Sequence, residues 1–197
     1  MARFEMQKEG TSPQEFFTRD VPPQFEKMMK ENPTAGMEGT VFSLQFRLGG
    51  EKYCLKISDA KRLEVIPGGI PDPTLEFEMT EADWRLSVTM GSEMGGIQDR
   101  LFDPTIINRK FYELLKSFKG KLQMEIIRPG KEPFRNTIRF NQGEHPSVAI
   151  SVAKDDLFAI FRGEVDPQVA FMSGKIKAKG DVSLLIKILP IISTPKN

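Results

Sequence analysis

The most informative part of this chain is the stretch KDDLFAIFRGEVDPQVAFMSGKIKAKGDVSLLIKI, residues 154–188. It predicts a short helix at 153–163, a strand at 174–181 and a last helix that begins at 182 and is almost entirely apolar. We expect Pro190 to disrupt the last turn of that helix. A helix that is apolar on every side is either buried on all sides or meets a ligand, a partner subunit or a membrane surface. The stretch therefore predicts an apolar interior at this end of the chain.

The predicted strand at 174–181 has two different faces. Lys175, Lys177 and Lys179 alternate along it with small or apolar residues. A row of lysines can bind the phosphate groups of nucleic acid or of lipid headgroups. More often it is a solvated face that protects an edge strand from pairing. We favour the solvated face, and the small residues opposite would leave room above the sheet.

The rest of the chain alternates between predicted strands and predicted helices. Apolar residues at every second position predict a β-hairpin that turns at Gly49-Gly50, and further strands; together they span 40–58, 61–66, 74–79, 121–127, 135–140 and 147–152. Capping residues, prolines and apolar stripes predict helices at 11–33, 80–90 and 103–120. Residues 72–86 align with residues 145–159, with their apolar positions in phase. An internal repeat would produce this pattern, and so would two unrelated strand-then-helix segments.

The composition argues against several classes of partner. With 28 basic and 27 acidic residues the net charge is +1, which gives no overall attraction for nucleic acid or for an anionic membrane. The single Cys leaves no intrachain disulfide and no cysteine zinc cluster. No apolar run resembles a secretory signal or approaches the roughly 20 residues of a transmembrane helix. We therefore expect a cytoplasmic protein.

Candidate catalytic groups are few. The only His, His145, precedes Pro146 in a loop, where turn formation explains it more simply than catalysis. Cys54 lies in a predicted strand and is interpreted as a small, semi-buried side chain. The Gly-rich segment at 91–96 lacks the Lys-Ser/Thr ending of a phosphate-binding loop. We expect no catalytic residue, no metal site and no cofactor, and hence no enzyme.

Phe and Met are unusually frequent. The chain has 15 Phe and 10 Met against one Trp and two Tyr. Such residues either fill a core loosely or line a deformable apolar cavity. Composition alone favours the filled core.

The quoted stretch resembles the sterol carrier protein type-two (SCP-2) family. In that family a helix of the form D-x-L-x-x-x-x-x-G is followed by D-P-x-x-A-F-x-x-G-K-[LI]-K-x-x-G-[DN]. The matching positions here are Asp155, Leu157, Gly163, Asp166, Pro167, Ala170, Phe171, Gly174, Lys175, Ile176, Lys177, Gly180 and Asp181. The chain from about 103 carries the whole family order of elements. The part from about 21 to 90 resembles the family's N-terminal portion and then departs, because GSEMGGIQDRLFDP replaces the G-K-[LI]-K strand.

The resemblance implies an α+β fold with a curved, mostly antiparallel sheet covered by helices. It also implies a duplication, with a truncated sterol-carrier-like half at 12–100 and a complete one at 103–192, which either stay separate or pack as one globule. Between sheet and helices the family holds an apolar tunnel for sterols, fatty acyl chains or other lipids. The residues that we expect to contact such a ligand are Phe140, Ile150, Phe158, Phe161, Phe171, Met172, Ile176, Leu185, Ile188 and Leu189.

The sequence thus predicts non-catalytic binding or transfer of an apolar ligand. Two alternatives stay open. One is a structural or interaction module whose own side chains fill the tunnel and whose terminal helix forms a homodimer. The other is an accessory domain that presents a lipid or quinone to an enzyme. The expected partners are a lipid or other apolar small molecule, no nucleic acid, and at most a transient contact with a membrane.

Overall fold

The computed structural model describes residues 10–31, 35–89, 108–117 and 119–192 of the chain. The strands are β1 (Val41–Leu48), β2 (Glu51–Ser58), β3 (Arg62–Pro67), β4 (Leu75–Met79), β5 (Gly120–Ile127), β6 (Phe134–Phe140), β7 (Ser147–Ala153) and β8 (Ile176–Gly180). The helices are α1 (Pro13–Glu15), the π-helical turn η1 (Phe16–Asp20), α2 (Val21–Glu31), α3 (Glu81–Thr89), α5 (Arg109–Ser117), α6 (Lys154–Phe161), α7 (Pro167–Met172) and α8 (Val182–Ile192).

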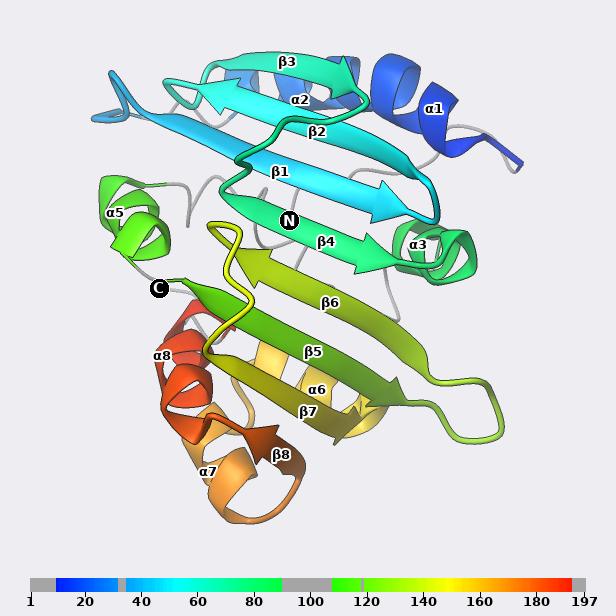
Figure 1. Cartoon of the computed structure of the whole chain (residues 1–197), viewed down its shortest axis with the longest axis vertical. Coiled ribbons are helices and arrows are strands. Elements are labelled where there is room, and N and C mark those ends of the chain that lie inside the picture. Colours follow the sequence, from blue (N-terminus) through cyan, green and yellow to red (C-terminus); the bar gives the residue numbers. More distant parts are fainter. Residues whose placement is uncertain (1–9, 32–34, 90–107, 118, 193–197) are drawn as a thin grey trace.

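All these strands belong to one sheet, with the order β3-β2-β1-β4-β6-β5-β7-β8. Neighbouring strands are antiparallel except for the pairs β1 with β4 and β5 with β7. Figure 1 shows α1, α2, α6, α7 and α8 on the far face of the sheet and α3 and α5 near the ends of strands. The predicted fold class, α+β with a mostly antiparallel sheet covered by helices, is therefore confirmed.

The N-terminal helical segment forms one continuous run. Ser12 caps α1 through a capping box with Glu15, as the sequence signals indicate. The wider turn η1 precedes Pro22 and Pro23, which cannot donate the backbone hydrogen bonds of an α-helix. The prolines therefore distort the helix without ending it. The expected end at Pro33 lies outside the described residues.

The two halves of the sheet share one topological motif. In each, a hairpin (β1–β2 or β5–β6) provides its first strand for a parallel pair with a later strand (β4 or β7). That later strand leads directly into a helix, α3 or α6. The correspondence agrees with the alignment of residues 72–86 and 145–159. Since unrelated chains can share a motif of this size, the duplication stays a prediction.

β4 and β6 join the two halves into a continuous sheet. They pair from Leu75 with Phe140 to Glu78 with Thr137. At this seam Glu76 is buried and accepts hydrogen bonds from Gln45 at 2.6 Å and from Arg47 at 3.3 Å. The buried carboxylate thus adds charged hydrogen bonds to the regular pairing of the strands.

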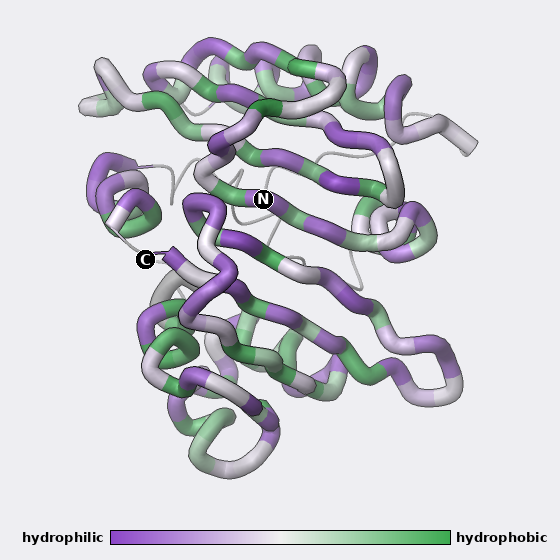
Figure 2. The backbone as a smooth tube through the Cα atoms, in the orientation of Figure 1, coloured by the Kyte–Doolittle hydropathy of each residue, from purple (hydrophilic) through white to green (hydrophobic). Residues whose placement is uncertain are grey.

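One face of the sheet, which we call the inner face, carries the hydrophobic core. Apolar and polar residues alternate along the strands, and Figure 2 shows this as changes between green and purple. In β5, Leu122, Met124 and Ile126 are buried, whereas Gln123 between them is exposed. Buried residues of the strands form one hydrophobic cluster with residues of η1, α2, α3, α5, α6, α7 and α8. The helices thus cover the inner face, and the opposite, outer face is polar.

The C-terminal half differs from the prediction in three respects. The sequence reasoning does not predict α7, although Asp166 caps it and Pro167 lies in its first turn. α8 continues to Ile192, so the expectation that Pro190 disrupts it is wrong. α8 is also not buried on every side, because Val182 and Ile186 are exposed. Segment 91–96 and the start of the predicted helix at 103 lie outside the described residues.

Candidate functional site

The predicted ligand-contacting residues lie mostly in one place, between the inner face and the C-terminal helices. Phe158 and Phe171 are partly buried and pack against the main hydrophobic cluster. Met172 is 85% exposed, so the structure does not bring it together with the others. The remaining residues are buried in that cluster, and we call them the C-terminal core: Phe140, Ile150, Phe161, Ile176, Leu185, Ile188 and Leu189.

α8 covers the C-terminal core and lies close to the sheet. It packs against β7, β8 and α7. At the start of β5, Gly120 has a φ of 153°, and a Cβ there would lie 2.8 Å from the carbonyl oxygen of Pro146 and 3.0 Å from Cδ2 of Leu184. Glycine at this position therefore lets Leu184 of α8 approach the backbone of β5.

The protein's own side chains fill the space between α8 and the sheet. Leu185, Ile188 and Leu189 expose only 0%, 1% and 2% of their surface. A side chain with so little accessible surface borders no space that could hold even a water molecule. Because such an interior is close-packed, an apolar ligand can enter here only by separating α8 from the sheet.

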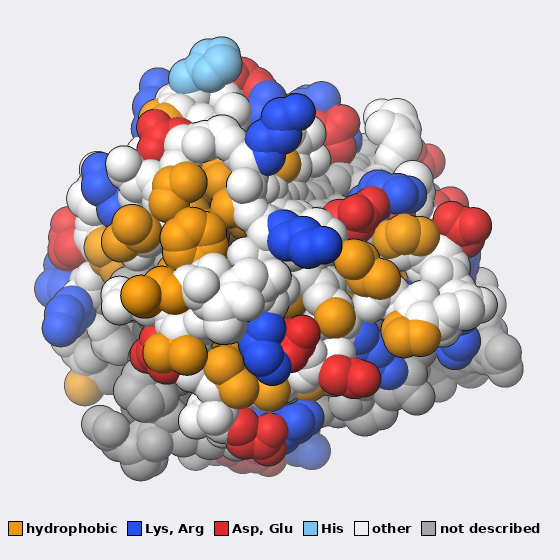
Figure 3. Space-filling view, turned by 90° about the horizontal axis from the view of Figure 1, so that it is seen from below, with side chains coloured by type: hydrophobic (Ala, Val, Ile, Leu, Met, Phe, Trp, Pro, Cys, Tyr) orange, Lys and Arg blue, Asp and Glu red, His pale blue; other side chains and the backbone are white. Residues whose placement is uncertain are grey.

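Exposed apolar side chains surround the outer edge of this region. They are Val169 and Met172 of α7, 57% and 85% exposed, and Val182 and Ile186 of α8, 37% and 49% exposed. We call these four residues the apolar rim. Figure 3 views this end of the molecule from below and shows hydrophobic side chains gathered beside basic side chains, Lys or Arg. Exposed apolar groups that lie together often mark a contact site, and here they lie on the two helices over the core.

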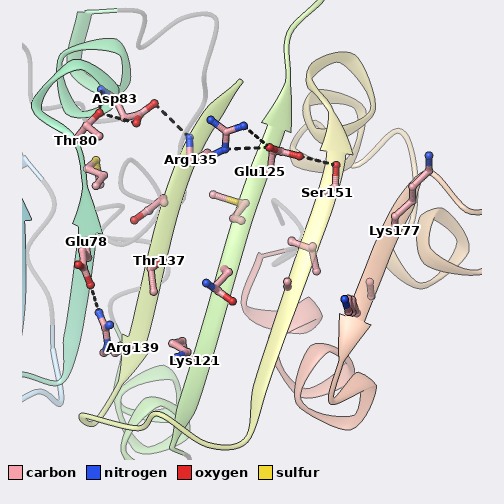
Figure 4. A pocket seen from close by; sticks show the side chains of 18 of the residues that line it. Glu78, Thr80, Asp83, Lys121, Glu125, Arg135, Thr137, Arg139, Ser151 and Lys177 are labelled. Atoms are coloured by element: carbon pink, nitrogen blue, oxygen red, sulfur yellow. Dashed lines mark hydrogen bonds and ion pairs between the residues drawn. The ribbon is translucent and has the colours of Figure 1, made fainter. Parts of the chain in front are cut away.

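A second candidate site is a hollow over the outer face of β4, β6, β5, β7 and β8, with a volume of about 1010 Å³. Figure 4 shows its polar side chains, which come from neighbouring strands and from the start of α3. Met124 and Asn136, whose side chains are on the inner face, also border the hollow. They do so because only the backbone of the sheet separates the inner face from the outer face. The hollow is wide and open to solvent, unlike the closed, mainly apolar pockets that hold small ligands.

Most of the charges in this hollow neutralise one another. Arg139 forms ion pairs with Glu76, Glu78 and Glu144. Arg135 pairs with Glu125 at 2.8 Å, and Lys121 pairs with Glu144. These pairs leave no concentrated field of one sign over the outer face. The hollow therefore resembles a solvated surface more than a site for a charged ligand.

These pairs shift the pKa of two groups. Hydrogen bonds from Lys121 and Arg139 lower the pKa of the Glu144 carboxyl to about 2. Partial burial acts to lower the pKa of Arg139, but its hydrogen bonds to Glu144 and Glu78 outweigh burial and raise it. Both groups are thus held in their charged forms at neutral pH.

The remaining chemical groups are placed as follows. Cys54 is fully buried, and burial raises the pKa of its thiol to about 11, so the thiolate nucleophile is suppressed. His145 is exposed in the loop before β7. Over the described ranges, no group of three or more His, Cys, Asp or Glu residues is arranged to hold a metal ion. No helix in the part of the chain that the structure describes is long and apolar enough to span a membrane.

The sequence reasoning missed the outer hollow and the apolar rim. The hollow has a signal in the sequence, because Lys121, Gln123 and Glu125 alternate with apolar residues in β5, and Thr137 and Arg139 alternate with Ile138 and Phe140 in β6. The rim depends on which side of α8 faces the sheet, and a helix apolar all round does not reveal that side. Only the packing of α8 decides it.

Comparison with known proteins connects the C-terminal half to one family. Residues 107–193 match the model of the SCP-2 sterol transfer family. Hydroxysteroid dehydrogenase-like protein 2 of Mus musculus is 44% identical over 45 residues, which are 23% of this chain and 9% of that protein. The protein of the same name from Danio rerio is 38% identical over 58 residues, which are 28% of this chain and 14% of that protein. The chain thus matches only about a tenth of the length of these relatives.

Two solved structures have weaker similarity. The sterol carrier protein domain 2 of Helicoverpa armigera shares 20% identity at a TM-score of 0.35, covering 46% of this chain and 80% of that one. The apo form of sterol carrier protein 2 from Yarrowia lipolytica shares 18% identity at a TM-score of 0.34, covering 55% of this chain and 93% of that one.

Proposed function

We propose that the chain binds or transfers an apolar ligand in its C-terminal half, because residues 107–193 match the model of the SCP-2 sterol transfer family. The ligand is a sterol, a fatty acyl chain or another lipid, and it lies between the inner face and α8. The family match carries the proposal. The C-terminal core supports it, because most of the residues expected to contact a ligand are buried in one hydrophobic cluster, to which α8 contributes Leu185, Ile188 and Leu189.

Ligand binding exchanges one apolar contact for another. α8 moves away from β7 and β8, and the lipid lies between Ile150 of β7 and the side chains of Leu185 and Ile188 on α8. Burying about 400 Å² of lipid surface would contribute about 10 kcal/mol before the costs of ordering and of opening the core. The apolar rim gives the lipid a first contact at the outer edge of α8. The hydrocarbon part of the lipid makes only apolar contacts with the protein. Because such contacts discriminate little between hydrocarbons, we expect several lipids to bind.

The proposed role is non-catalytic, and the protein would act on a ligand only by holding and releasing it. A second candidate is presentation of the ligand to an enzyme, which the name of the hydroxysteroid dehydrogenase-like relatives favours. To test it, a steroid-oxidising dehydrogenase would be supplied with a hydroxysteroid either free or pre-bound to this protein. Faster turnover of the pre-bound steroid would support presentation, and slower turnover would indicate simple sequestration.

The N-terminal half is proposed to be a truncated copy of the same unit, with residues 12–100 and 103–192 as its two parts. The shared hairpin-and-parallel-pair motif supports this reading. The alternative role, a structural module that dimerises along α8, uses the same exposed Val182 and Ile186. Light scattering of the purified chain with and without lipid separates the two. A dimer that persists unchanged when lipid is bound would favour the structural role.

The main test is native mass spectrometry of the purified chain, followed by displacement of a fluorescent fatty acid. We expect a co-purifying lipid and saturable displacement. Absence of both would contradict the proposed function.

A matched pair of variants locates the site. Ala178 lies on the inner face of β8 beside Ile150 and packs against the main cluster. Ala149 lies on the outer face of β7 opposite Lys179. Ala178→Leu should weaken binding of the fluorescent fatty acid by about fivefold or more, because the added atoms occupy a close-packed interior. Ala149→Leu should change it by less than about twofold, as surface substitutions do.

A further inference from the structure

The inner face contains one buried polar side chain that its surroundings do not satisfy. Asn136 of β6 exposes 5% of its surface. Its Oδ1 atom is buried and has no hydrogen-bond donor within reach among the described residues. Three other atoms share this condition, but they belong to Arg47, Arg128 and Gln142, whose side chains are partly exposed and can turn toward water. Asn136 is thus unusual, since buried amides are almost always hydrogen-bonded.

The side chain of Asn136 belongs to the helix-covered side of the sheet. Along β6 it alternates with Arg135 and Thr137 and shares its face with the buried Phe134 and Ile138. Its neighbour across the ladder is Met124 of β5. The thioether of Met is at most a weak acceptor and cannot donate a hydrogen bond to Oδ1. The local sequence therefore places an amide in apolar surroundings, where it costs folding free energy.

Asn136 lies in line with the proposed ligand site. Met124 pairs with Ile150 of β7, and Ile150 pairs with Ala178 of β8. With strands about 4.8 Å apart, the row from Asn136 to Ala178 is about 14 Å long. α3 packs on β6, α6 packs on β5 and β7, and α8 packs on β7 and β8, so these three helices cover the row. A lipid lying between α8 and the sheet could therefore follow this row and reach the amide with one end.

We infer that Asn136 hydrogen-bonds the hydroxyl group of the bound ligand, and that the protein prefers uncharged lipids with one terminal hydroxyl. This inference rests on the proposed function. A hydroxyl both donates and accepts, so it matches either end of the Asn136 amide. The ligand thus supplies the partner that the folded protein lacks, while its apolar body lies over Met124, Ile150 and Ala178.

An ionised fatty acid fits this position less well. A carboxylate only accepts hydrogen bonds, so it offers no donor to Oδ1. The nearest cation along β6, Arg135, is on the outer face and pairs with Glu125. A carboxylate at Asn136 would therefore be buried without a counter-charge, which is costly. The amide accordingly selects against the charged headgroup and in favour of the hydroxyl.

The test compares two ligands that differ only in the hydroxyl, 1-hexadecanol and n-hexadecane, supplied from cyclodextrin. Their association constants are measured on the full chain by competition against N-phenyl-1-naphthylamine, an uncharged apolar fluorophore. Asn136→Leu has nearly the same volume and removes the amide. Met124→Leu is the control, because it alters the neighbouring side chain in the same row and removes no hydrogen-bonding group of comparable strength.

We expect Asn136→Leu to lower the ratio of the hexadecanol to hexadecane constants by about three- to tenfold, the effect of one neutral hydrogen bond. Met124→Leu should leave this ratio unchanged. Asn136→Leu should also raise the denaturation midpoint of the ligand-free protein, because an unsatisfied polar group is lost. A buried water that satisfies Asn136 would produce the opposite shift.

An unchanged ratio in Asn136→Leu would overturn the inference while leaving the proposed function intact, since both ligands would still bind. Failure of both ligands to displace the fluorophore from the unmodified protein would instead contradict the proposed function, and the inference with it. The two failures are therefore distinguishable.

Discussion

The two halves of the sheet are covered in different ways. Over the N-terminal half, aromatic rings pack against one another. The ring centroid of Phe17 lies 4.9 Å from that of Tyr53, on which it is stacked, 4.9 Å from that of Phe46 and 6.1 Å from that of Trp84. Over the C-terminal half, α8 contributes only aliphatic side chains to the core, Leu184, Leu185, Ile188 and Leu189. Aromatic pairs have preferred geometries, whereas aliphatic contacts are non-directional.

From this difference we infer that the two halves of the continuous sheet have different roles, one rigid and one able to open. The N-terminal half is a fixed scaffold, since its rings hold η1 and α3 in defined positions. Under the proposed function, the C-terminal half is the part that opens, because α8 exchanges its aliphatic contacts for those of a lipid. The exposed Val182 and Ile186 on α8 have no counterpart among the interlocked rings of the scaffold.

The largest effect is expected from Phe17→Ala in the scaffold. Removing this ring, which is 1% exposed, should lower the free energy of unfolding by about 3–5 kcal/mol. Urea denaturation followed by the fluorescence of Trp84, the only Trp, measures the loss. The folded fraction should bind a fluorescent fatty acid with unchanged affinity. A large loss of affinity at full folding would show that the scaffold takes part in binding.

Leu185→Ala should loosen the C-terminal half. The variant should lower the free energy of unfolding by about 2–5 kcal/mol, and it should speed the association of the fluorescent fatty acid, because α8 opens more easily. Leu55→Ala in β2 is the matched control, since Leu55 is also a buried leucine, 1% exposed. Stopped-flow fluorescence measures the association rates. Equal acceleration by both variants would argue against α8 as the element that opens.

Gly120→Ala should disturb the packing of α8 against the start of β5. The added Cβ would meet the carbonyl oxygen of Pro146 and the side chain of Leu184, so we expect a loss of about 1–3 kcal/mol. Gly130→Ala is the control, because Gly130 also has a positive φ, 67°, but a Cβ added there would have no atom within 4 Å. Thermal denaturation and fatty acid binding are measured for both. If only stability changes in Gly120→Ala, α8 is not coupled to binding through this contact.

The smallest effect is expected from Glu144→Gln in the loop between β6 and β7. The pKa of Glu144 is lowered from 4.5 to about 2, so its carboxylate stabilises the folded protein above pH 4.5. That contribution is lost as the pH falls through about 2. Urea denaturation at pH 7 and at pH 3 should therefore show a difference between the two proteins that shrinks at the lower pH. The difference is small because the group is exposed. A difference that grows toward pH 3 would contradict this assignment.

Much of the fold could be predicted because local signals and burial agree. Thr11 or Ser12 before Pro13 predicts the start of α1, where the structure has Ser12 as the cap, and Gly49-Gly50 marks the hairpin turn. The alternation of Leu122, Met124 and Ile126 identifies the inner face of β5. In such segments the period of the apolar residues is enough to fix both the element and its buried side.

The candidate site was predicted less completely. The helix α8 follows from the sequence pattern, but its buried side does not, because Val182 and Ile186 look the same as Leu185 in the sequence. Asn136 stands at an inner position of β6, which the alternation with Phe134 and Ile138 shows. Its lack of a hydrogen-bond partner depends on residues from other strands and helices, so no local pattern could reveal it.

A lipid that binds between α8 and the inner face, while the aromatic scaffold stays closed, would protect only the C-terminal half from hydrogen exchange. Mass spectrometry measures this exchange with and without 1-hexadecanol. We predict slower amide exchange in β7, β8 and α8 on binding, and no change in β1, β2 and α2. Slower exchange confined to β1, β2 and α2, or no change anywhere under saturating 1-hexadecanol, would contradict this binding mode.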